Sequence, residues 1–401
     1  MRKVKLDSSV ILLGLIAILV IGGIILAVDS FRSDPIERAI TGERVINTLF
    51  IIEKDAQPFS TYVLMFYPVT RRAAVFDIPG STGGILQRIS RVDRLTAVYD
   101  PQRIAPFKNE VERLLGIDIP FSFVMTVENM GKIIDLVQGV EVFIPAAVDE
   151  YFDGHILFPS GRVFLDGAKA AVFATYVLQY ESEELVSARR QQFFMSFVRH
   201  IGEQSQFLKN KEASRLFHSF IRSPSNQRMR TRLFDEIAGV NIDRATIQTV
   251  RGTVRDVSGE QLLFPHQDGN LIREVVSHTM AELLRNDDSV IDRALTVEIL
   301  NGTTVTGLAS RTAELLQDFG YNIVNFGNAD HNNYDRTQII DRSGNQQRAK
   351  DFADIIRCRN IIFEPPSGAH IEGSGGAQNA MHRSDFTLIL GRDFNGRHVT
   401  H

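Results

Sequence analysis

Residues 113–145, RLLGIDIPFSFVMTVENMGKIIDLVQGVEVFIP, decide the fold of this chain. They begin with the end of an amphipathic helix, which we expect to stop at Gly116 because glycine is common just after a helix C-terminus. The β-branched and aromatic run 121–127 predicts a strand, residues 130–137 a helix, and residues 140–144 another strand. Strands that alternate with helices in this way indicate helices packed on a central sheet, so the expected fold class is α/β.

Segments on both sides of that stretch extend the pattern. Upstream lie three predicted strands, rich in β-branched and aromatic residues, at residues 45–52, 60–69 and 72–79. Residues 81–84, STGG, read as a loop. Downstream, beyond a glycine-punctuated segment, helices are predicted at residues 168–180 and 184–203. We therefore expect one layered domain over residues 45–203.

A second α/β unit is expected at residues 295–401. Its first half reads as strand, Asn-Gly turn, helix ending at Gly320, and strand. A helix at residues 346–357 follows, with strands at residues 360–365 and 385–391. The order of elements is that of a small α/β domain.

The region between the two units, residues 204–294, is polar and predicted to be mainly helical, with a strand-like stretch at residues 246–254. It carries a basic cluster, RSPSNQRMRTRLF, at residues 222–234. Such a cluster suits contact with anionic lipid headgroups or with a partner protein.

An uninterrupted apolar run, VILLGLIAILVIGGIILAV, fills residues 10–28. As a helix it would nearly span a hydrocarbon core of about 30 Å. Basic residues precede it, so the positive-inside rule predicts a cytoplasmic tail at residues 1–9, a stalk at residues 29–44, and an extracytoplasmic, periplasmic location for the rest. We expect a single-pass protein of the cytoplasmic (inner) membrane, with a cleaved signal peptide as the alternative.

Charge and cysteine content narrow the function classes. A formal net charge of −4 gives no electrostatic case for nucleic acid, so no nucleic-acid partner is expected. Cys358 is the single cysteine, which excludes an intramolecular disulfide. Its neighbours Arg357 and Arg359 would activate a thiolate, whereas a small buried side chain at a helix end is the plainer interpretation.

Amide side chains are concentrated in two places in the C-terminal unit. One is the pair Asn301-Gly302, and the other is NFGNADHNN at residues 325–333. Exposed amides suit hydrogen bonding to sugar hydroxyls, which would allow contact with peptidoglycan or with a protein. Turn chemistry explains the same residues, and both interpretations stay open.

Three sequence motifs, taken in their order along the chain, carry a resemblance to a known family. They are AAVFDIP at residues 73–79, the stretch 113–145 already quoted, and FLDGAKAAVFATYV at residues 164–177 leading to ARRQQ at residues 188–192. Behind an apolar N-terminal segment, this order resembles the LytR-CpsA-Psr (LCP) family of cell-envelope proteins. The C-terminal unit resembles the separate LytR C-terminal domain of that family, on residues 297–321 and 385–394.

The resemblance implies a transferase outside the membrane that moves an anionic glycopolymer from a polyprenyl-pyrophosphate carrier to peptidoglycan. In such proteins arginines grip the pyrophosphate, often with magnesium held by acidic side chains, because the leaving group concentrates negative charge. If this activity is present, we expect Arg190, which matches a family arginine, to bind phosphate together with its neighbour Arg189, and Glu184 to bind magnesium. The prenyl tail would lie in an apolar tunnel, for which the matching positions are Val75, Ile78, Val124, Phe173 and Val177.

The charged positions of the family are largely replaced. After Ile78 and Pro79, the family's Arg-Asp is here Gly80-Ser81. After residues 176–177, Tyr-Val, the family's Arg-x-Arg is here residues 178–180, Leu-Gln-Tyr. About four aligned cations are missing, and each charge-assisted contact to phosphate is worth about 1.5–3 kcal/mol.

A chain that keeps the apolar positions and loses the charges favours binding without turnover. The leading hypothesis is a catalytically degenerate, pseudoenzyme member that acts as a scaffold in envelope assembly and binds a polyprenyl-phosphate lipid, peptidoglycan or an envelope protein. The alternative is an active glycopolymer transferase of the phosphotransferase type that uses substituted arginines, and magnesium is expected only in that case.

Overall fold

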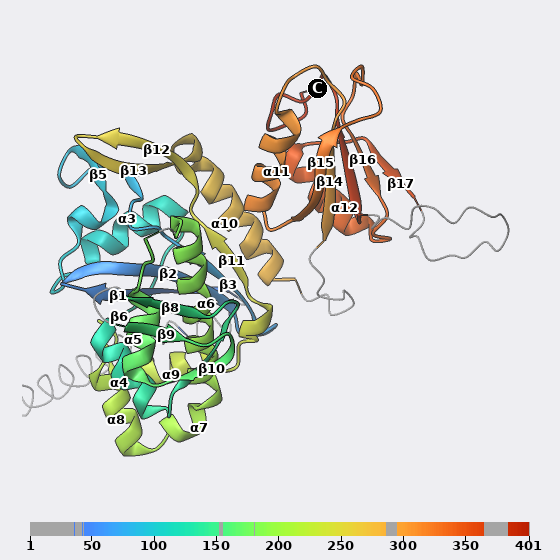
Figure 1. Cartoon of the computed structure of the whole chain (residues 1–401). Coiled ribbons are helices and arrows are strands. Elements are labelled where there is room, and N and C mark those ends of the chain that lie inside the picture. Colours follow the sequence, from blue (N-terminus) through green and yellow to red (C-terminus); the bar gives the residue numbers. More distant parts are fainter. Residues whose placement is uncertain are drawn as a thin grey trace, which may run out of the picture. The chain divides into compact units, whose positions relative to one another are not determined.

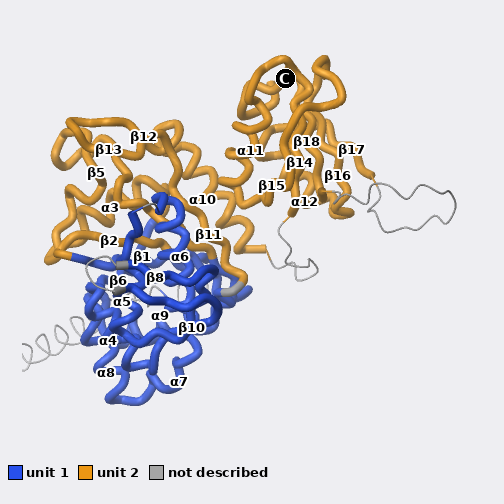
Figure 2. The backbone as a smooth tube through the Cα atoms, in the orientation of Figure 1, with its two compact units in different colours: residues 1–54, 64–73, 118–243 blue, residues 55–63, 74–117, 244–401 orange. Residues whose placement is uncertain are grey.

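The fold was established from a computed structural model of the chain. The structure describes Ile36, Gly42 and residues 44–151, 155–179, 181–285, 295–364 and 384–400. Within those residues no helix is both long and apolar enough to cross a membrane. The predicted anchor at residues 10–28 and the predicted tail at residues 1–9 lie outside the described part. The chain divides into two compact units, residues 1–54, 64–73 and 118–243, and residues 55–63, 74–117 and 244–401 (Figure 2).

The central sheet has five strands in the order β11-β3-β2-β1-β6 (Figure 1). They are β1 (Ile46–Lys54), β2 (Gln57–Tyr67), β3 (Arg72–Asp77), β6 (Phe121–Thr126) and β11 (Thr246–Thr249). β1 is parallel to β6, and β3 is parallel to β11. Asp55 and Ala56, between β1 and β2, both have positive φ, as a tight hairpin requires. The predicted strands of this region are confirmed.

Four predicted helices are present. They are α3 (Ala105–Leu115), α4 (Val127–Leu136), α5 (Gly167–Thr175) and α6 (Glu183–Glu203). α5 ends five residues before the predicted end at residue 180, because Tyr176 is extended. Gly116 follows α3 in the left-handed region, with φ of 69°. The side chains of Thr126, Asp166 and Ser182 each accept a backbone N–H hydrogen bond at the start of α4, α5 and α6.

Several hairpins were not predicted. The expected loop at residues 81–84 enters β4 (Gly83–Leu86), which pairs with β5 (Arg91–Arg94). β8 (Val148–Tyr151) pairs with β9 (His155–Phe158), and β10 (Gly161–Leu165) pairs with β7 (Val140–Ile144). A Cβ on Gly83 would lie 3.1 Å from the Cβ of Leu262, so glycine at that strand position allows close packing and does not mark a loop.

The region after α6 combines helices with a hairpin. Its helices are α7 (Ser205–Leu208), α8 (Lys211–Ser219), α9 (Gln227–Ala238) and α10 (Asn270–Leu283). The strand-like stretch at residues 246–254 is confirmed, although it is divided between β11 and β12 (Gly252–Val257). β12 pairs with β13 (Glu260–Pro265), a strand that the sequence reading missed.

The C-terminal part forms a second five-stranded sheet, in the order β15-β14-β18-β16-β17. Its elements are β14 (Thr296–Asn301), α11 (Leu308–Asp318), β15 (Asn322–Asn328), β16 (Gln338–Asp341), α12 (Gln346–Ile356), β17 (Ile361–Phe363) and β18 (Phe386–Leu390). It has its own apolar core, in which the rings of Phe352 and Phe386 stack with centroids 4.8 Å apart. The predicted strands and helices of this α/β part are confirmed, with β16 as an additional strand.

Candidate functional site

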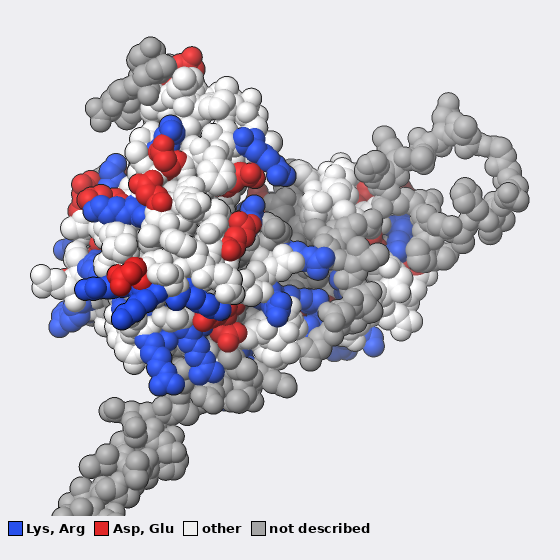
Figure 3. All heavy atoms as spheres, turned by 90° about the horizontal axis from the view of Figure 1, so that it is seen from below, with Lys and Arg blue, Asp and Glu red and all other residues white. Residues whose placement is uncertain are grey.

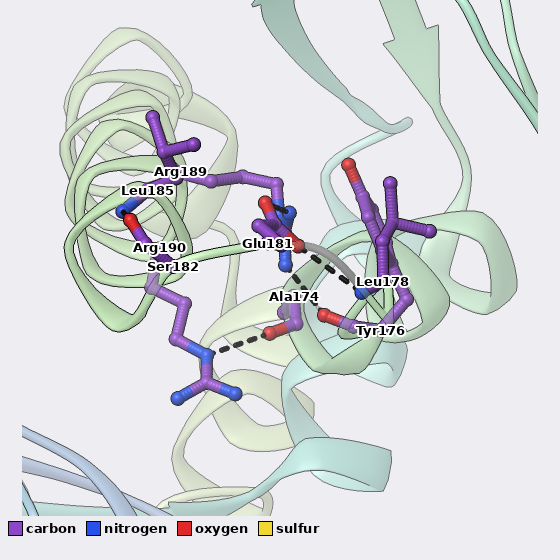
Figure 4. A network of polar contacts seen from close by, with 8 residues as sticks. All are labelled: Ala174, Tyr176, Leu178, Glu181, Ser182, Leu185, Arg189 and Arg190. Carbon is purple, nitrogen blue, oxygen red and sulfur yellow. Dashed lines mark hydrogen bonds and ion pairs between the residues drawn. The ribbon is translucent and has the colours of Figure 1, made fainter.

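The two predicted gripping residues lie where α6 passes the end of α5 (Figure 4). Arg189 and Arg190 are neighbours on α6, and successive helix residues point about 100° apart. Despite this, both guanidinium groups reach back to carbonyl oxygens at the C-terminus of α5. The last carbonyls of a helix lack partners within the helix and carry partial negative charge, so they favour cations.

Arg189 is enclosed by protein groups. Its side chain is 9% exposed and forms an ion pair through Nη1 with Glu181, which is 12% exposed. Nη2 donates to the carbonyl oxygen of Tyr176, and Cζ lies 3.6 Å from the centroid of the Tyr176 ring. The carboxylate of Glu181 also accepts a hydrogen bond from the N–H of Leu178 at 3.2 Å. The charge of Arg189 is therefore matched inside the protein.

Arg190 makes a less enclosed contact. Its Nε donates to the carbonyl oxygen of Ala174 at 3.2 Å, one residue before the end of α5. Figure 4 shows the rest of its guanidinium pointing away from Arg189 and Glu181. The structure thus brings both arginines to α5 and directs the two side chains to different environments.

Glu184, the predicted magnesium ligand, lies exposed in the first turn of α6. Hydrogen bonds from its own backbone N–H and from the Ser182 side chain lower the pKa of its carboxyl group. Among the described residues, no three His, Cys, Asp or Glu side chains converge on a point that could hold a metal ion. A single exposed carboxylate such as Glu184 does not by itself fit a magnesium site.

The five apolar positions differ in burial. Val75 in β3, Ile78, Val124 in β6 and Phe173 in α5 are at most 3% exposed, whereas Val177 is 41% exposed. Phe173 packs edge-on against the ring of Phe158, with centroids 5.4 Å apart. Four of the five are core side chains, and their role towards a lipid stays a prediction.

The basic cluster at residues 222–234 separates into two groups. Arg222 pairs with the buried carboxylate of Glu53, and Arg230 Nη1 donates to a backbone carbonyl oxygen at 3.3 Å. Arg228 and Arg232, on α9, instead line a surface cleft of about 560 Å³. Two of the four arginines of the cluster, Arg222 and Arg230, therefore stabilise the fold.

Sequence reasoning missed Glu181 and Tyr176. The sequence does place an acidic residue, Glu181, between two predicted helices and eight positions before Arg189, which could have suggested a partner for that arginine. That spacing does not specify a contact, because the loop conformation decides whether the carboxylate turns towards α6.

Comparisons with known proteins add to this geometry. Residues 294–394 match the family described as LytR cell envelope-related transcriptional attenuator. The chain is 27% identical over 269 residues to the cell wall biosynthesis protein LcpA of Corynebacterium glutamicum, covering 63% of this chain and 51% of that protein. The match thus spans about half the length of that relative.

Solved structures agree in fold. B. subtilis TagV superposes with a TM-score of 0.52 at 18% identity, over 60% of this chain and 98% of that one. The predicted resemblance to the LytR-CpsA-Psr family is confirmed. A transcriptional regulator from Enterococcus faecalis is also similar in fold, with a TM-score of 0.51 at 14% identity, over 61% of this chain and 89% of that one.

Proposed function

We propose that this chain is an LCP-like scaffold of the cell envelope, held in the cytoplasmic membrane by residues 10–28 with its domains outside. It would bind a polyprenyl lipid, peptidoglycan or an envelope protein without transferring a glycopolymer. Its likeness to a cell wall biosynthesis protein supports the envelope role. The observation that supports the non-catalytic role is the pairing of Arg189 with Glu181.

The free energies of the interactions that Arg189 would exchange favour this proposal over the transferase alternative. To grip a pyrophosphate, Arg189 would first have to leave a buried partner, and breaking such a pair costs about 3–5 kcal/mol. A charge-assisted hydrogen bond returns about 1.5–3 kcal/mol. The exchange is therefore unfavourable unless other cations join it, and most of the other charged positions of the family motif are not cationic here.

A transfer assay tests the function directly. The full chain in detergent is supplied with magnesium, peptidoglycan and a mass-tagged glycopolymer on polyprenyl pyrophosphate. We expect no linked product above the level of a protein-free reaction. Appearance of tagged peptidoglycan would establish the transferase alternative.

The role of Arg189 can be tested through stability. Arg189→Gln leaves the Glu181 carboxylate buried and unpaired, so we expect the free energy of unfolding in urea to fall by about 3–5 kcal/mol. The matched control is Lys132→Gln, which removes an exposed pair with Glu128 on α4 and should leave stability unchanged.

Native mass spectrometry with polyprenyl pyrophosphate distinguishes the same two functions. For a scaffold we expect any binding to be independent of magnesium and equal in the wild-type chain and Arg190→Gln. Binding that requires magnesium and is lost in Arg190→Gln would contradict the scaffold proposal, since it would reveal a working phosphate site.

A further inference from the structure

The C-terminal domain contains a hollow of about 670 Å³. Its lining comes from Asn301 and residues 303–307, at the end of β14 and after it, and from residues 328–332, at the end of β15 and after it. β14 and β15 are parallel neighbours, so both loops leave the sheet at its carboxyl edge. In open α/β sheets, ligands bind outside the carboxyl ends of the strands.

A buried amide shapes the first wall of the hollow. Asn301 is 7% exposed, and its Nδ2 donates to the carbonyl oxygen of Val305 at 2.9 Å. Its Oδ1 accepts from the N–H and the hydroxyl of Thr303, at 3.0 and 2.8 Å. The loop is therefore fixed before any ligand arrives, which reduces the entropy cost of binding.

The two walls are also tied to each other. The N–H of Ala329 donates to the carbonyl oxygen of Asn301 at 2.9 Å, and that of Tyr334 donates to the carbonyl oxygen of Gly302 at 3.0 Å. A Cβ on Gly302 would lie 2.5 Å from the Tyr334 ring and 2.8 Å from the carbonyl oxygen of Leu390. Glycine at this position thus allows the two loops to meet.

The lining has the chemistry of a site for neutral polar ligands. It carries exposed amides at Asn328 and Asn332 and exposed hydroxyls at Thr304 and Thr306, which both donate and accept hydrogen bonds. Asp330 is the acidic residue of the lining, and neither lysine nor arginine occurs in it. Arg311, whose Nη1 donates to the carbonyl oxygen of Thr306 at 3.2 Å, lies beside the lining and is not part of it.

A ring pair completes the hollow. The imidazole of His331, one of the lining residues, stacks on Tyr334 with centroids 4.2 Å apart and planes at 20°. Such a pair is a flat surface with polar edges, suited to the C–H face of a sugar ring. The volume lies within the usual range for ligand pockets, about 300–1,000 Å³.

We propose that this hollow, lined by Asn301 and by residues 303–307 and 328–332, binds an uncharged oligosaccharide through the hydroxyl and acetamido groups of its sugars. The site is separate from the arginines on α6, so it stands whether or not the scaffold proposal is correct. It selects one of the two interpretations that the amide-rich sequence left open.

Saturation-transfer NMR of the full chain with the tetrasaccharide of N-acetylglucosamine tests the site. We expect saturable binding that weakens at least tenfold in Asn328→Ala and in His331→Ala. The control is Asn325→Ala on the same strand, where the amide donates to Glu298 at 2.9 Å and is not part of the lining. This variant should bind like the wild-type chain.

Other outcomes would overturn the proposal. These are absence of saturable binding, equal loss in Asn325→Ala, or tighter binding of a sugar-free tetrapeptide or of inorganic phosphate at the same residues. All substituted side chains are exposed, so equal melting temperatures will show that each variant is folded.

Discussion

At the scale of single residues, the fate of a charge depends on what surrounds it. Arg189 is an arginine beside a family position, yet Glu181 and the end of α5 occupy its donors. Arg190, which matches the family position, donates through Nε to the carbonyl oxygen of Ala174. An arginine in or beside a motif is therefore not by that fact available to a ligand.

Cys358 illustrates the same dependence. It is 5% exposed, and burial raises the pKa of its thiol despite the adjacent arginines in the sequence. Because the thiolate is the reactive form, a raised pKa opposes activation. The interpretation as a small buried side chain at a helix end is confirmed.

His218 in α8 makes stability depend on pH. Burial, together with the charge of Arg230, lowers its pKa to about 4, against about 6.5 in the unfolded chain. Between these values the unfolded state binds more protons, so stability is fully present above pH 6.5 and declines as pH falls towards 4. We expect His218→Gln to show a smaller loss of melting temperature between pH 7 and 4.5 than the wild-type chain.

The control for that experiment is His331→Gln, which changes an exposed histidine. It should retain the wild-type pH dependence. If His218→Gln and His331→Gln lose the same number of degrees on acidification, the buried imidazole is not the cause.

At the scale of elements, α4 and α5 pack closely because two glycines face each other. A Cβ on Gly167 would collide with the carbonyl oxygen of Gly131 and lie 2.7 Å from Asp135 Oδ2. The N–H of Gly167 donates to Oδ1 of that carboxylate at 2.7 Å. The start of α5, and with it the position of its C-terminus beneath Arg189, depends on this contact.

Gly167→Ala should therefore destabilise the fold. We expect the free energy of unfolding in urea to fall by about 1–3 kcal/mol, the usual cost of overpacking. Gly84→Ala is the control, since a Cβ there would meet nothing within 4 Å. Equal stabilities of the two variants would show that α4 and α5 separate at little cost.

At the scale of the whole molecule, the C-terminal part has what an independent domain needs. Its sheet, two helices and core are all contributed by residues 295–400.

On the face shown in Figure 3, basic side chains gather towards one edge with acidic side chains among them. Mixed charge of this kind gives no large field of one sign, in agreement with the small net charge.

We expect a fragment of residues 290–401 to unfold cooperatively in urea by circular dichroism. Phe352→Ala, which empties the centre of its core, should remove about 3–5 kcal/mol of stability or unfold the fragment. Phe326→Ala is the control, because that ring is 54% exposed. A gradual, non-cooperative loss of signal in the unsubstituted fragment would contradict an independent domain.

The sequence by itself determined the elements and the fold class. Strand and helix periodicity, capping residues such as Thr126 and Ser182, and the glycine after α3 are local signals, since each acts within a few residues of its own position. The family resemblance followed from the same local phrases. Hairpins such as β4 with β5 were missed because glycine there serves packing against a residue far along the chain.

Only the tertiary structure decided which side chains meet. The pair of Arg189 with Glu181 and the hollow between residues 301–307 and 328–332 depend on how separate loops fold against one another. Such contacts carry no fixed spacing, because burial and the closing of loops set them rather than periodicity. For this reason the sequence could name Arg189 and the asparagines but not their surroundings, and in this chain the surroundings distinguish a structural ion pair from a binding site.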